Sequence, residues 1–165
     1  MAKKKNKKSG MISTDQTVAD NRKSRFDYEL HDTFEAGIML KGTEVKSLRL
    51  RQCSIKESYV GPKDGDLWLF NANISEYQQA SPSLQHDPKR PRKLLLHKSE
   101  INKLMGAVNR QGMSIVATRL FFDSRGKAKL EIALAKGKKT HDKRQTEKKR
   151  DWGKQKQRLL KTSQN

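Results

Sequence analysis

The segment from residue 136 to residue 165 constrains the fold of this chain most, because it cannot pack into a core. It contains twelve Lys or Arg and three acidic residues, but only three large apolar side chains, Trp152, Leu159 and Leu160. Such a segment buries too little surface to offset the entropy of ordering it, so alone it should stay unfolded. Its side chains still favour helix. A basic, helix-prone arm predicts a polyanionic partner that orders it, and RNA fits best.

Charge divides the chain into three parts. Residues 1–25 carry a net charge of about +6, residues 26–135 about +4 and the last thirty residues about +9, within a total of +19. We therefore predict a flexible basic arm over residues 1–20, a compact body over 21–135 and a basic tail over 136–165. Basic extensions on a weakly charged body are typical of a nucleic-acid binder. An anionic membrane surface is the rival polyanion, but the apolar stripe of the tail is too thin for an interfacial anchor.

Targeting signals and cysteine usage indicate where such a protein works. The sequence has no run of about 18 apolar residues that could span a membrane. The basic stretch from Lys3 to Lys8 is not followed by the apolar stretch of a signal peptide. The single cysteine, Cys53, cannot form an internal disulfide and is consistent with a reducing compartment. We expect a cytoplasmic protein without a membrane partner.

The body is rich in short segments with the period-two alternation of half-buried strands. We predict strands over residues 25–30, 34–40, 55–60, 67–75, 113–122 and 127–135. Asp64-Gly65 is a strong two-residue hairpin turn, and residues 123–126 join the last two strands. Gly37 interrupts the second strand, which indicates a bulge or a close approach of another backbone.

Two helices are predicted beside the strands. Thr43 can cap the first, over residues 44–51, with Val45 and Leu48 turned inward. The second begins at Ser99 and can end at Gly112. About six short strands joined by tight turns favour a mainly β fold in which an antiparallel sheet closes into a small barrel, with a helix across one end. An open α+β sheet is the alternative.

Signs of catalysis or of a metal site are few. The four histidines are scattered, and none has a cysteine or another histidine at metal-ligand spacing. No phosphate-binding glycine motif occurs. The adjacent pair His86-Asp87 could act as a catalytic dyad, but a turn or an RNA contact is the better interpretation of a pair so close in sequence. We predict no enzyme activity, no cofactor and no metal, while a nuclease that uses scattered carboxylates stays open.

Candidates for RNA contacts lie in two strands of the body. Glu35 is either a solvated strand carboxylate or an acceptor for a base amino group or a ribose hydroxyl. In the leucine run at 94–96, alternation sends neighbours to opposite faces, so Leu95 is expected to face outward. An exposed leucine that follows Arg92 and Lys93 could pack on an unstacked base.

The tail has a helical pattern. On a helix, Trp152, Leu159 and Leu160 share one face. Two oppositely charged pairs lie at i, i+3 spacing, Glu147 with Arg150 and Asp151 with Lys154, and each is worth only about 0.2–0.5 kcal/mol. These pairs bias the tail toward helix without holding it there. The alternative interpretation is a solvated arm that only increases solubility.

A set of short motifs in a fixed order adds a family resemblance. The motifs are Asn21-Arg22-Lys23, Glu35-Ala36-Gly37, Gly42-Thr43-Glu44-Val45-Lys46-Ser47-Leu48-Arg49, His86-Asp87-Pro88, Arg92-Lys93-Leu94-Leu95-Leu96, Ala135-Lys136-Gly137-Lys138-Lys139 and Asp142-Lys143-Arg144. From about Asn21 to Trp152 the chain closely resembles the SsrA-binding proteins, also called the small protein B family. One departure lies after Arg49, where the family's usual Ala-Gly-Lys is replaced by Leu50-Arg51-Gln52, so the glycine that would end the first helix in the left-handed conformation is missing.

The resemblance implies a fold and a function. The fold would be an OB-like antiparallel barrel with two or three flanking helices, followed by a basic C-terminal tail that is disordered when free. The family binds the tRNA-like domain of transfer-messenger RNA and delivers it to stalled ribosomes for trans-translation, without catalysis of its own. Elongation factor Tu would take part indirectly, through the charged RNA. The protein would act as a monomer.

The resemblance also implies roles for individual residues. RNA contacts would be made by residues at both ends of the body and in the strands between: Asn21, Arg22, Lys23, Glu35, Arg92, Lys93, Leu95, Lys138 and Lys139. The tail would enter the empty messenger channel of the small ribosomal subunit and become helical there. Its ribosome-binding residues would be His141, Asp142, Lys143, Arg144, Trp152, Leu159 and Leu160.

Two other classes of function remain open from the sequence. A general ribosomal or assembly protein would associate with all ribosomes and show no preference for a tRNA-like fold. A metal-dependent nuclease would lose RNA cleavage when Asp87 or Glu35 is replaced.

Overall fold

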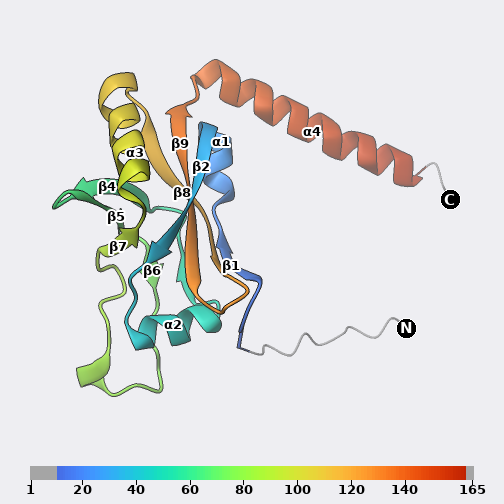
Figure 1. Cartoon of the computed structure of the whole chain (residues 1–165). Coiled ribbons are helices and arrows are strands. Elements are labelled where there is room, and N and C mark those ends of the chain that lie inside the picture. The colour runs from blue at the N-terminus through green and yellow to red at the C-terminus, as the bar shows by residue number, and fades with distance from the viewer. Residues whose placement is uncertain (1–10, 163–165) are drawn as a thin grey trace, which may run out of the picture.

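The computed structural model describes residues 11–162. The lysine cluster at residues 3–8, part of the predicted basic arm, lies outside these residues. Within 11–162 the chain order is β1 (Gln16–Asp20), α1 (Arg22–Asp27), β2 (Tyr28–Ile38), α2 (Gly42–Arg49), β3 (Cys53–Ser54), β4 (Tyr59–Lys63), β5 (Asp66–Phe70), β6 (Asn73–Ile74), a 3-10 turn (Pro82–Leu84), β7 (Arg92–Leu95), α3 (Lys98–Gln111), β8 (Ser114–Phe122), β9 (Ala128–Gly137) and α4 (Thr140–Thr162) (Figure 1).

The main sheet closes on itself, as predicted for a small antiparallel barrel. Its strand order is β1-β8-β4-β5-β7-β2-β9, and β8 pairs with β9 as well. That additional pairing joins β8, β4, β5, β7, β2 and β9 into a ring, with β1 added along β8. Because closure leaves few unpaired edges, the outer wall of the ring presents side chains rather than backbone.

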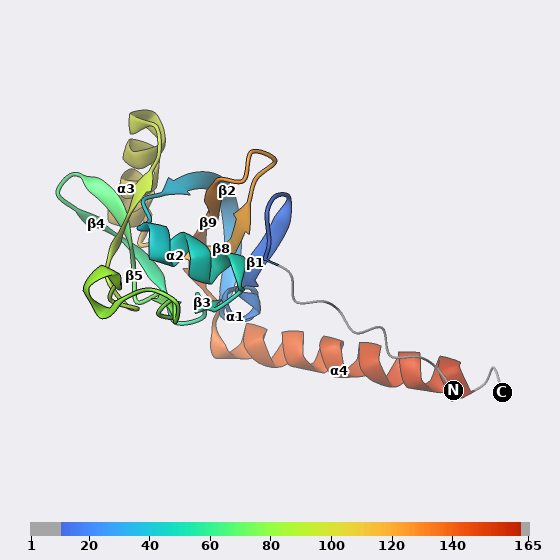
Figure 2. The same ribbon diagram turned by 90° about the horizontal axis from the view of Figure 1, so that it is seen from below.

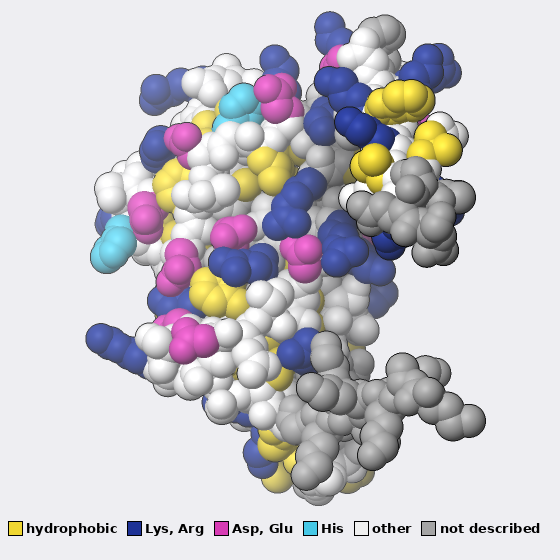
Figure 3. Space-filling model, turned by 90° about the vertical axis from the view of Figure 1, so that its right-hand side faces the viewer, with side chains coloured by type: hydrophobic (Ala, Val, Ile, Leu, Met, Phe, Trp, Pro, Cys, Tyr) yellow, Lys and Arg dark blue, Asp and Glu magenta, His cyan; other side chains and the backbone are white. Residues whose placement is uncertain are grey.

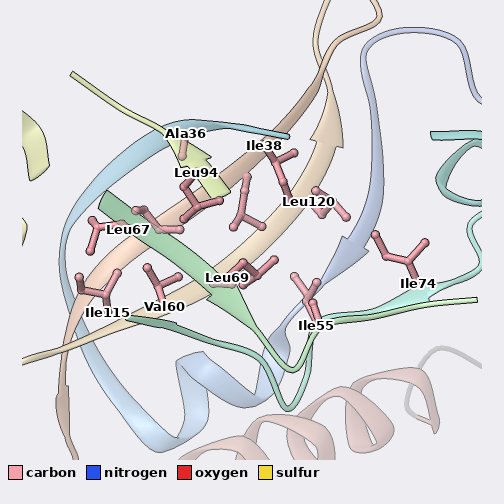
Figure 4. Packing of buried hydrophobic residues seen from close by; sticks show 14 of the residues in the cluster. Ala36, Ile38, Ile55, Val60, Leu67, Leu69, Ile74, Leu94, Ile115 and Leu120 are labelled. Atoms are coloured by element: carbon pink, nitrogen blue, oxygen red, sulfur yellow. The ribbon is translucent and has the colours of Figure 1, made fainter. Parts of the chain in front are cut away.

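The core fills the inside of the ring. Inward-facing Leu67 and Leu69 of β5, Leu94 of β7 and Leu130 of β9 are each no more than 1% exposed. Figure 4 shows these strands directing apolar side chains toward one another from opposite walls. Burying one such side chain contributes about 1.5–3 kcal/mol, so this core supplies most of the stability of the body.

The predicted turns are confirmed. Asp64 and Gly65 both have positive φ, +53° and +77°, as a two-residue type I′ hairpin requires. They join Lys63 of β4 directly to Asp66 of β5. Helix α3 ends at Gly112 in the left-handed conformation, as the sequence indicated.

The N-terminal boundary of the body differs from the prediction. The structure places residues 12–20 with the body, since β1 pairs with β8 and Ile12 is 3% exposed. Residues 25–27 were predicted to be in a strand, but they belong to helix α1. Phe26 extended the alternation of β2 backward by chance, whereas Tyr28 does begin that strand. The local signal for helix is Asn21, whose side chain accepts a hydrogen bond from the Ser24 backbone at 3.2 Å and caps α1.

Strand β2 is one long strand rather than two. Its pairing with β9 shifts register between Leu30 and Thr33, so the irregularity lies there and not at Gly37. Gly37 instead allows a close approach, because a Cβ atom at this position would lie 3.2 Å from the Cβ atom of Leu95. The strand predicted over residues 55–60 is also displaced: β3 ends at Ser54 and β4 begins at Tyr59.

Helix α2 begins and ends differently from the prediction. Glu44, not Thr43, closes its first turn, by accepting a hydrogen bond from the Lys41 backbone at 2.7 Å. The helix ends at Arg49, and Arg51 then adopts a positive φ of +59°. Arg51 therefore takes the left-handed conformation that a glycine would adopt at lower cost.

The basic tail forms a helix that projects from the barrel. Figures 1 and 2 show α4 leaving the body beside α1 and extending away from it. Lys136 and Gly137, assigned to the tail from the sequence, complete β9 instead. The helical preference predicted for the tail agrees with α4, whereas its disorder in the free protein stays a prediction.

Candidate nucleic-acid interface

Glu35 and Leu95 lie close together on the outer wall of the barrel. Strands β2 and β7 pair so that Gly37 is opposite Leu95, and Glu35 points to the same side two residues before Gly37. Leu95 is 51% exposed, whereas Leu94 is 1% exposed. The outward direction expected for Leu95 is therefore confirmed. Because Gly37 has no side chain, Leu95 packs directly over the β2 backbone.

Lys129 completes this group. It lies opposite Gly37 on the other side of β2, and its Nζ atom is 3.7 Å from Oε1 of Glu35. The Glu35 side chain is still 57% exposed, so its carboxylate remains available to a donor from outside. Lys129 was not among the predicted RNA contacts, although its place on the polar side of an alternating strand was a signal for it.

Lys93 belongs to the same surface, and Arg92 does not. Lys93 lies two residues before Leu95 and faces outward, with its Nζ atom 2.7 Å from the Asp66 carboxylate. Arg92 faces the interior and is fully buried. Its guanidinium donates to Glu44 at 2.8 Å, to the Ala72 carbonyl at 2.8 Å and to the Pro88 carbonyl at 2.9 Å. The expectation of an RNA contact from Arg92 is incompatible with this position, because alternation in β7 turns it inward.

Glu44 is the centre of this buried ionic network. Both of its oxygens are occupied, since Arg90 donates at 2.9 and 2.6 Å in addition to Arg92 and the Lys41 backbone. Burial alone would raise the pKa of Glu44, but the hydrogen bonds from Arg90 and Lys41 and the charge of Arg92 outweigh it, so the pKa is lowered. The network therefore ties α2 to the loop that leads into β7.

Asn21 is also a structural residue. It is 3% exposed, and its amide donates to the Ala117 carbonyl at 2.9 Å and to the Ile55 carbonyl at 3.3 Å, while its oxygen caps α1. Every polar atom of the side chain is thus used inside the protein. Its two neighbours are accessible: the side chains of Arg22 and Lys23 are 92% and 54% exposed. A hydrogen bond from Lys23 to Glu57 and the charge of Glu57 raise the pKa of Lys23.

Helix α1 and the start of the tail form a second basic group. Lys138 donates from its backbone to the Asp27 carbonyl at 3.0 Å and from its side chain to the Arg25 carbonyl at 3.1 Å. Lys143 of α4 lies 3.1 Å from the Asp27 carboxylate, and Lys139 is exposed beside them. A cleft of 550 Å³ borders this group, between α1, β4, α3 and β8. The structure thus divides the predicted RNA contacts between the outer wall and this end of the barrel.

The side chains of α4 are almost all exposed. Trp152, Leu159 and Leu160 are 66%, 68% and 57% exposed, and their spacing places them on one face of the helix. Figure 3, viewed from the side on which the tail projects, shows Lys and Arg side chains around hydrophobic ones. Asp142 and Arg144 are exposed, and Lys143 is partly buried against α1. The side chain of His141 lies outside the described residues.

A catalytic site is not favoured by the described residues. His86 is 2% exposed, with Nδ1 2.8 Å from the Thr43 hydroxyl and Nε2 3.0 Å from the Ile74 carbonyl. Both ring nitrogens are therefore used structurally, whereas Asp87 accepts from the Lys89 backbone. Burial raises the pKa of Cys53 to about 12, so this thiol is a poor nucleophile. Between residues 11 and 162, no three His, Cys, Asp or Glu side chains gather as a metal site would require.

Comparison with known proteins matches the chain to one family. The family model described as SmpB protein matches residues 18–162. This chain belongs to the SmpB family. The SsrA-binding protein of Rhodopseudomonas palustris (strain BisB18) is 60% identical over 145 residues, which cover 88% of this chain and 92% of that protein. The SsrA-binding protein of Bradyrhizobium sp. (strain BTAi1) is 61% identical over 143 residues, covering 87% and 90%.

A solved structure agrees with this assignment. It is described as "tmRNA-SmpB: a journey to the center of the bacterial ribosome" and is 46% identical to this chain. The likeness covers 73% of this chain and 84% of that one, with a TM-score of 0.61. The SmpB family match ends at residue 162, the last residue of α4, so the basic tail is part of what the family shares. Across residues 11–162, none of the helices is apolar over a length that could cross a membrane.

Proposed function

We propose that this protein binds the tRNA-like domain of transfer-messenger RNA and delivers it to stalled ribosomes for trans-translation. The observation that carries the proposal is its 60% identity, over 88% of the chain, to proteins named for binding SsrA. The solved structure of a family member described with transfer-messenger RNA and the ribosome supports the same function. The ribosome is rescued and the nascent peptide is tagged for degradation.

The barrel wall supplies the RNA contacts in this proposal. Glu35 accepts from a base amino group or a ribose hydroxyl, Leu95 packs on an unstacked base, and Lys93 and Lys129 contact phosphates. A carboxylate is repelled by phosphate, so Glu35 at this position favours reading a base edge or a sugar. Arg22, Lys23, Lys138 and Lys139 contribute further phosphate contacts at the end of the barrel. Asn21 and Arg92 act indirectly, because they hold α1 and β7 in place.

The tail supplies the ribosome contact. Most side chains of α4 are exposed, so its basic surface and its apolar face are accessible to a partner. We assign His141, Asp142, Lys143 and Arg144 to its ribosome-binding base, and Trp152, Leu159 and Leu160 to a face that packs in the empty messenger channel. Messenger RNA in that channel would exclude the tail by volume and by charge. Elongation factor Tu meets the protein only through the charged RNA, in the cytoplasm, and no catalysis by the protein is needed.

The RNA bound in cells tests the proposal most simply. The full-length protein is purified from cells under mild salt, and the co-purifying RNA is sequenced. We expect strong enrichment of transfer-messenger RNA relative to total RNA. Enrichment of ribosomal RNA in proportion to its abundance would instead indicate a general ribosomal protein, and a pool of cleaved fragments would indicate a nuclease.

A further inference from the structure

The outer wall of β4 and β5 carries aromatic side chains where a barrel of this kind usually presents polar ones. Tyr59 of β4 lies opposite Phe70 of β5, and Gly61 lies opposite Trp68. The alternate residues Leu67 and Leu69 face the core, so Trp68 and Phe70 must face outward. We call Tyr59, Trp68 and Phe70 the aromatic wall. Scattered exposed hydrophobic residues are ordinary, but three adjoining aromatic rings on an outer face are not.

The Tyr59–Phe70 pair is a stacked platform. The ring centroids are 5.3 Å apart and the planes are inclined by only 19°, which is an offset-stacked arrangement. Tyr59 is the outer member and is 56% exposed. Phe70 is partly covered by it. Stacking on Phe70 therefore fixes the orientation of the exposed Tyr59 ring before a further flat group stacks on it.

Trp68 is fixed in position as well. Its indole nitrogen donates to the Lys63 carbonyl at 3.0 Å, and the Lys63 ammonium lies 4.8 Å from the ring centroid. Gly61, opposite Trp68 on β4, has no side chain, and the Phe70 ring packs over it: a Cβ atom there would lie 3.4 Å from Cε2 of Phe70. The indole is thus anchored at its polar edge and lies next to a cation, a combination that suits an aromatic and anionic ligand.

The aromatic wall is continuous with the proposed RNA contacts. Trp68 lies opposite Lys93 of β7, Lys93 is two residues from Leu95, and Leu95 lies opposite Gly37 of β2. Strands β4, β5, β7 and β2 are consecutive in the sheet. Neighbouring strands are about 4.8 Å apart, so the surface from Glu35 to Tyr59 crosses roughly 15 Å. A short single-stranded segment of a few nucleotides has this reach.

The charges on this surface favour a polyanion such as RNA over a neutral or basic partner. Lys63 and Lys93 flank Trp68, and Asp66 beside them is already paired with Lys93 at 2.7 Å. A flat ring between cations can hold a base by its π-face and its phosphates by charge. A neutral or basic partner would have to bury these lysines without neutralising them.

We propose that the aromatic wall is a base-stacking subsite, on which Tyr59 and Trp68 stack unpaired bases of the same RNA that Glu35 and Leu95 contact. This inference rests on the proposed function. It extends the RNA footprint from β2 and β7 across β5 to β4. Stacking is tolerant of sequence, so the subsite adds affinity for unpaired loop nucleotides without selecting particular bases.

Binding of the tRNA-like domain of transfer-messenger RNA, transcribed in vitro, tests the subsite. The variants are Tyr59→Ala, Tyr59→Leu and Tyr59→Phe, with Leu84→Ala as the control, because Leu84 is 69% exposed in the 3-10 turn outside the aromatic wall. We expect Tyr59→Ala and Tyr59→Leu to weaken binding about tenfold, and Tyr59→Phe and Leu84→Ala to bind like the wild type. Tyr59→Leu keeps an apolar side chain over Phe70, so it serves if Tyr59→Ala does not fold.

The salt dependence separates stacking from charge. An uncharged ring does not change the number of counterions that the RNA releases on binding. The slope of log affinity against log salt concentration should therefore be the same for Tyr59→Leu and the wild type. If Tyr59→Leu bound the RNA with wild-type affinity, the subsite would be overturned. If the same variant also bound ribosomes more weakly, the aromatic wall would belong to a ribosomal partner instead. Failure of the wild type to prefer this RNA would instead overturn the proposed function.

Discussion

The barrel wall and helix α4 carry similar basic side chains on supports of opposite kinds. Side chains of the wall stand on strands whose inner faces form one core, so their positions are fixed before any partner arrives. Helix α4 has no core of its own, and near its start Lys143 forms an ion pair with Asp27 of α1. In proteins most helical stability comes from the packing of an apolar face, and the side chains of α4 are mostly exposed. The wall can therefore select a shape, whereas α4 can adapt to a channel and depends on it for order.

Removal of α4 should have the largest effect, because it separates the function of the tail from that of the barrel wall. Cutting the chain after Lys139 removes α4 but leaves β9 whole, since Lys136 and Gly137 pair with Glu29 and Tyr28. We expect peptide tagging on stalled ribosomes to be abolished, while affinity for the tRNA-like domain changes by no more than about threefold. Tagging in a reconstituted translation system and RNA binding by filter retention measure the two effects. Loss of both together would show that the regions are not separable.

Disruption of the buried ionic network around Glu44 should destabilise the barrel and leave helix α4 unaffected. Arg92→Met leaves Glu44 without its fully buried partner, and breaking a buried pair costs about 3–5 kcal/mol. For a chain of this size that corresponds to a fall in the thermal midpoint of roughly 10 °C. Arg22→Met is the matched control, because the Arg22 side chain is 92% exposed beside Asp20. Thermal unfolding followed by circular dichroism compares them, and equal midpoints would mean that Arg92 does not stabilise the body.

The glutamate of the same network should make the stability of the barrel dependent on pH. The folded pKa of Glu44 lies below its usual 4.5, so its contribution to the free energy of unfolding is complete above that value. It is lost as the pH falls from 4.5 through the lowered folded pKa. The difference in thermal midpoint between the wild type and Glu44→Gln should therefore shrink as the pH is lowered through this range. A difference that stays constant down to pH 3 would show that the charge of Glu44 is not what stabilises the fold.

Loss of the exposed carboxylate on the wall should affect binding rather than stability. Glu35→Ala removes an acceptor, and hydrogen bonds involving a charged group are worth about 1.5–3 kcal/mol, so RNA affinity should fall about tenfold or more. Its side chain is 57% exposed, so the thermal midpoint should change by less than about 2 °C. Glu35→Gln keeps an acceptor and should lose less. Since Glu35→Ala makes the surface more positive, an increase in affinity would show that binding is governed by net charge alone.

The smallest effect should come from the end of α2. Arg51 is held at a φ of +59°, which costs a non-glycine residue about 1 kcal/mol. Arg51→Gly should therefore raise the free energy of unfolding by up to about 1 kcal/mol, reduced by the loss of the exposed hydrogen bond from Arg51 to Gln16. Urea denaturation measures it, with Arg125→Gly as a control at a second exposed arginine in a turn. A destabilised Arg51→Gly would mean that the bond to Gln16 outweighs the backbone strain.

Sequence patterns predicted the parts of the fold that depend on local chemistry. Period-two alternation located β8 and β9 and turned Leu95 outward, and the paired positive φ values of Asp64 and Gly65 follow from their residue types. Strand β1 was missed because its sequence, Gln-Thr-Val-Ala-Asp, alternates weakly and gains its order from pairing with β8. Helix α1 was missed because six residues carry little periodic signal, and the local cap at Asn21 was not recognised as the start of a helix.

The candidate site was predictable to the same extent. Alternation predicted that Leu95 faces outward, whereas the position of Glu35 and Lys93 on the same face follows from the pairing of β2 with β7. Arg92 was misplaced because a sequence cannot show that an arginine has a buried carboxylate 48 positions away, as Arg92 has in Glu44. The aromatic wall and Lys129 depend on the strand order of a closed ring, which local patterns do not specify.

Hydrogen exchange measured separately over the barrel strands and over α4 tests the central claim most directly. The protein is compared free, on ribosomes with an empty messenger channel and on ribosomes whose channel is filled by messenger RNA. We predict protected barrel strands in every state, and α4 amides that exchange rapidly except on ribosomes with the empty channel. Protection of α4 in the free protein, or equal protection whether or not the channel is filled, would contradict this account.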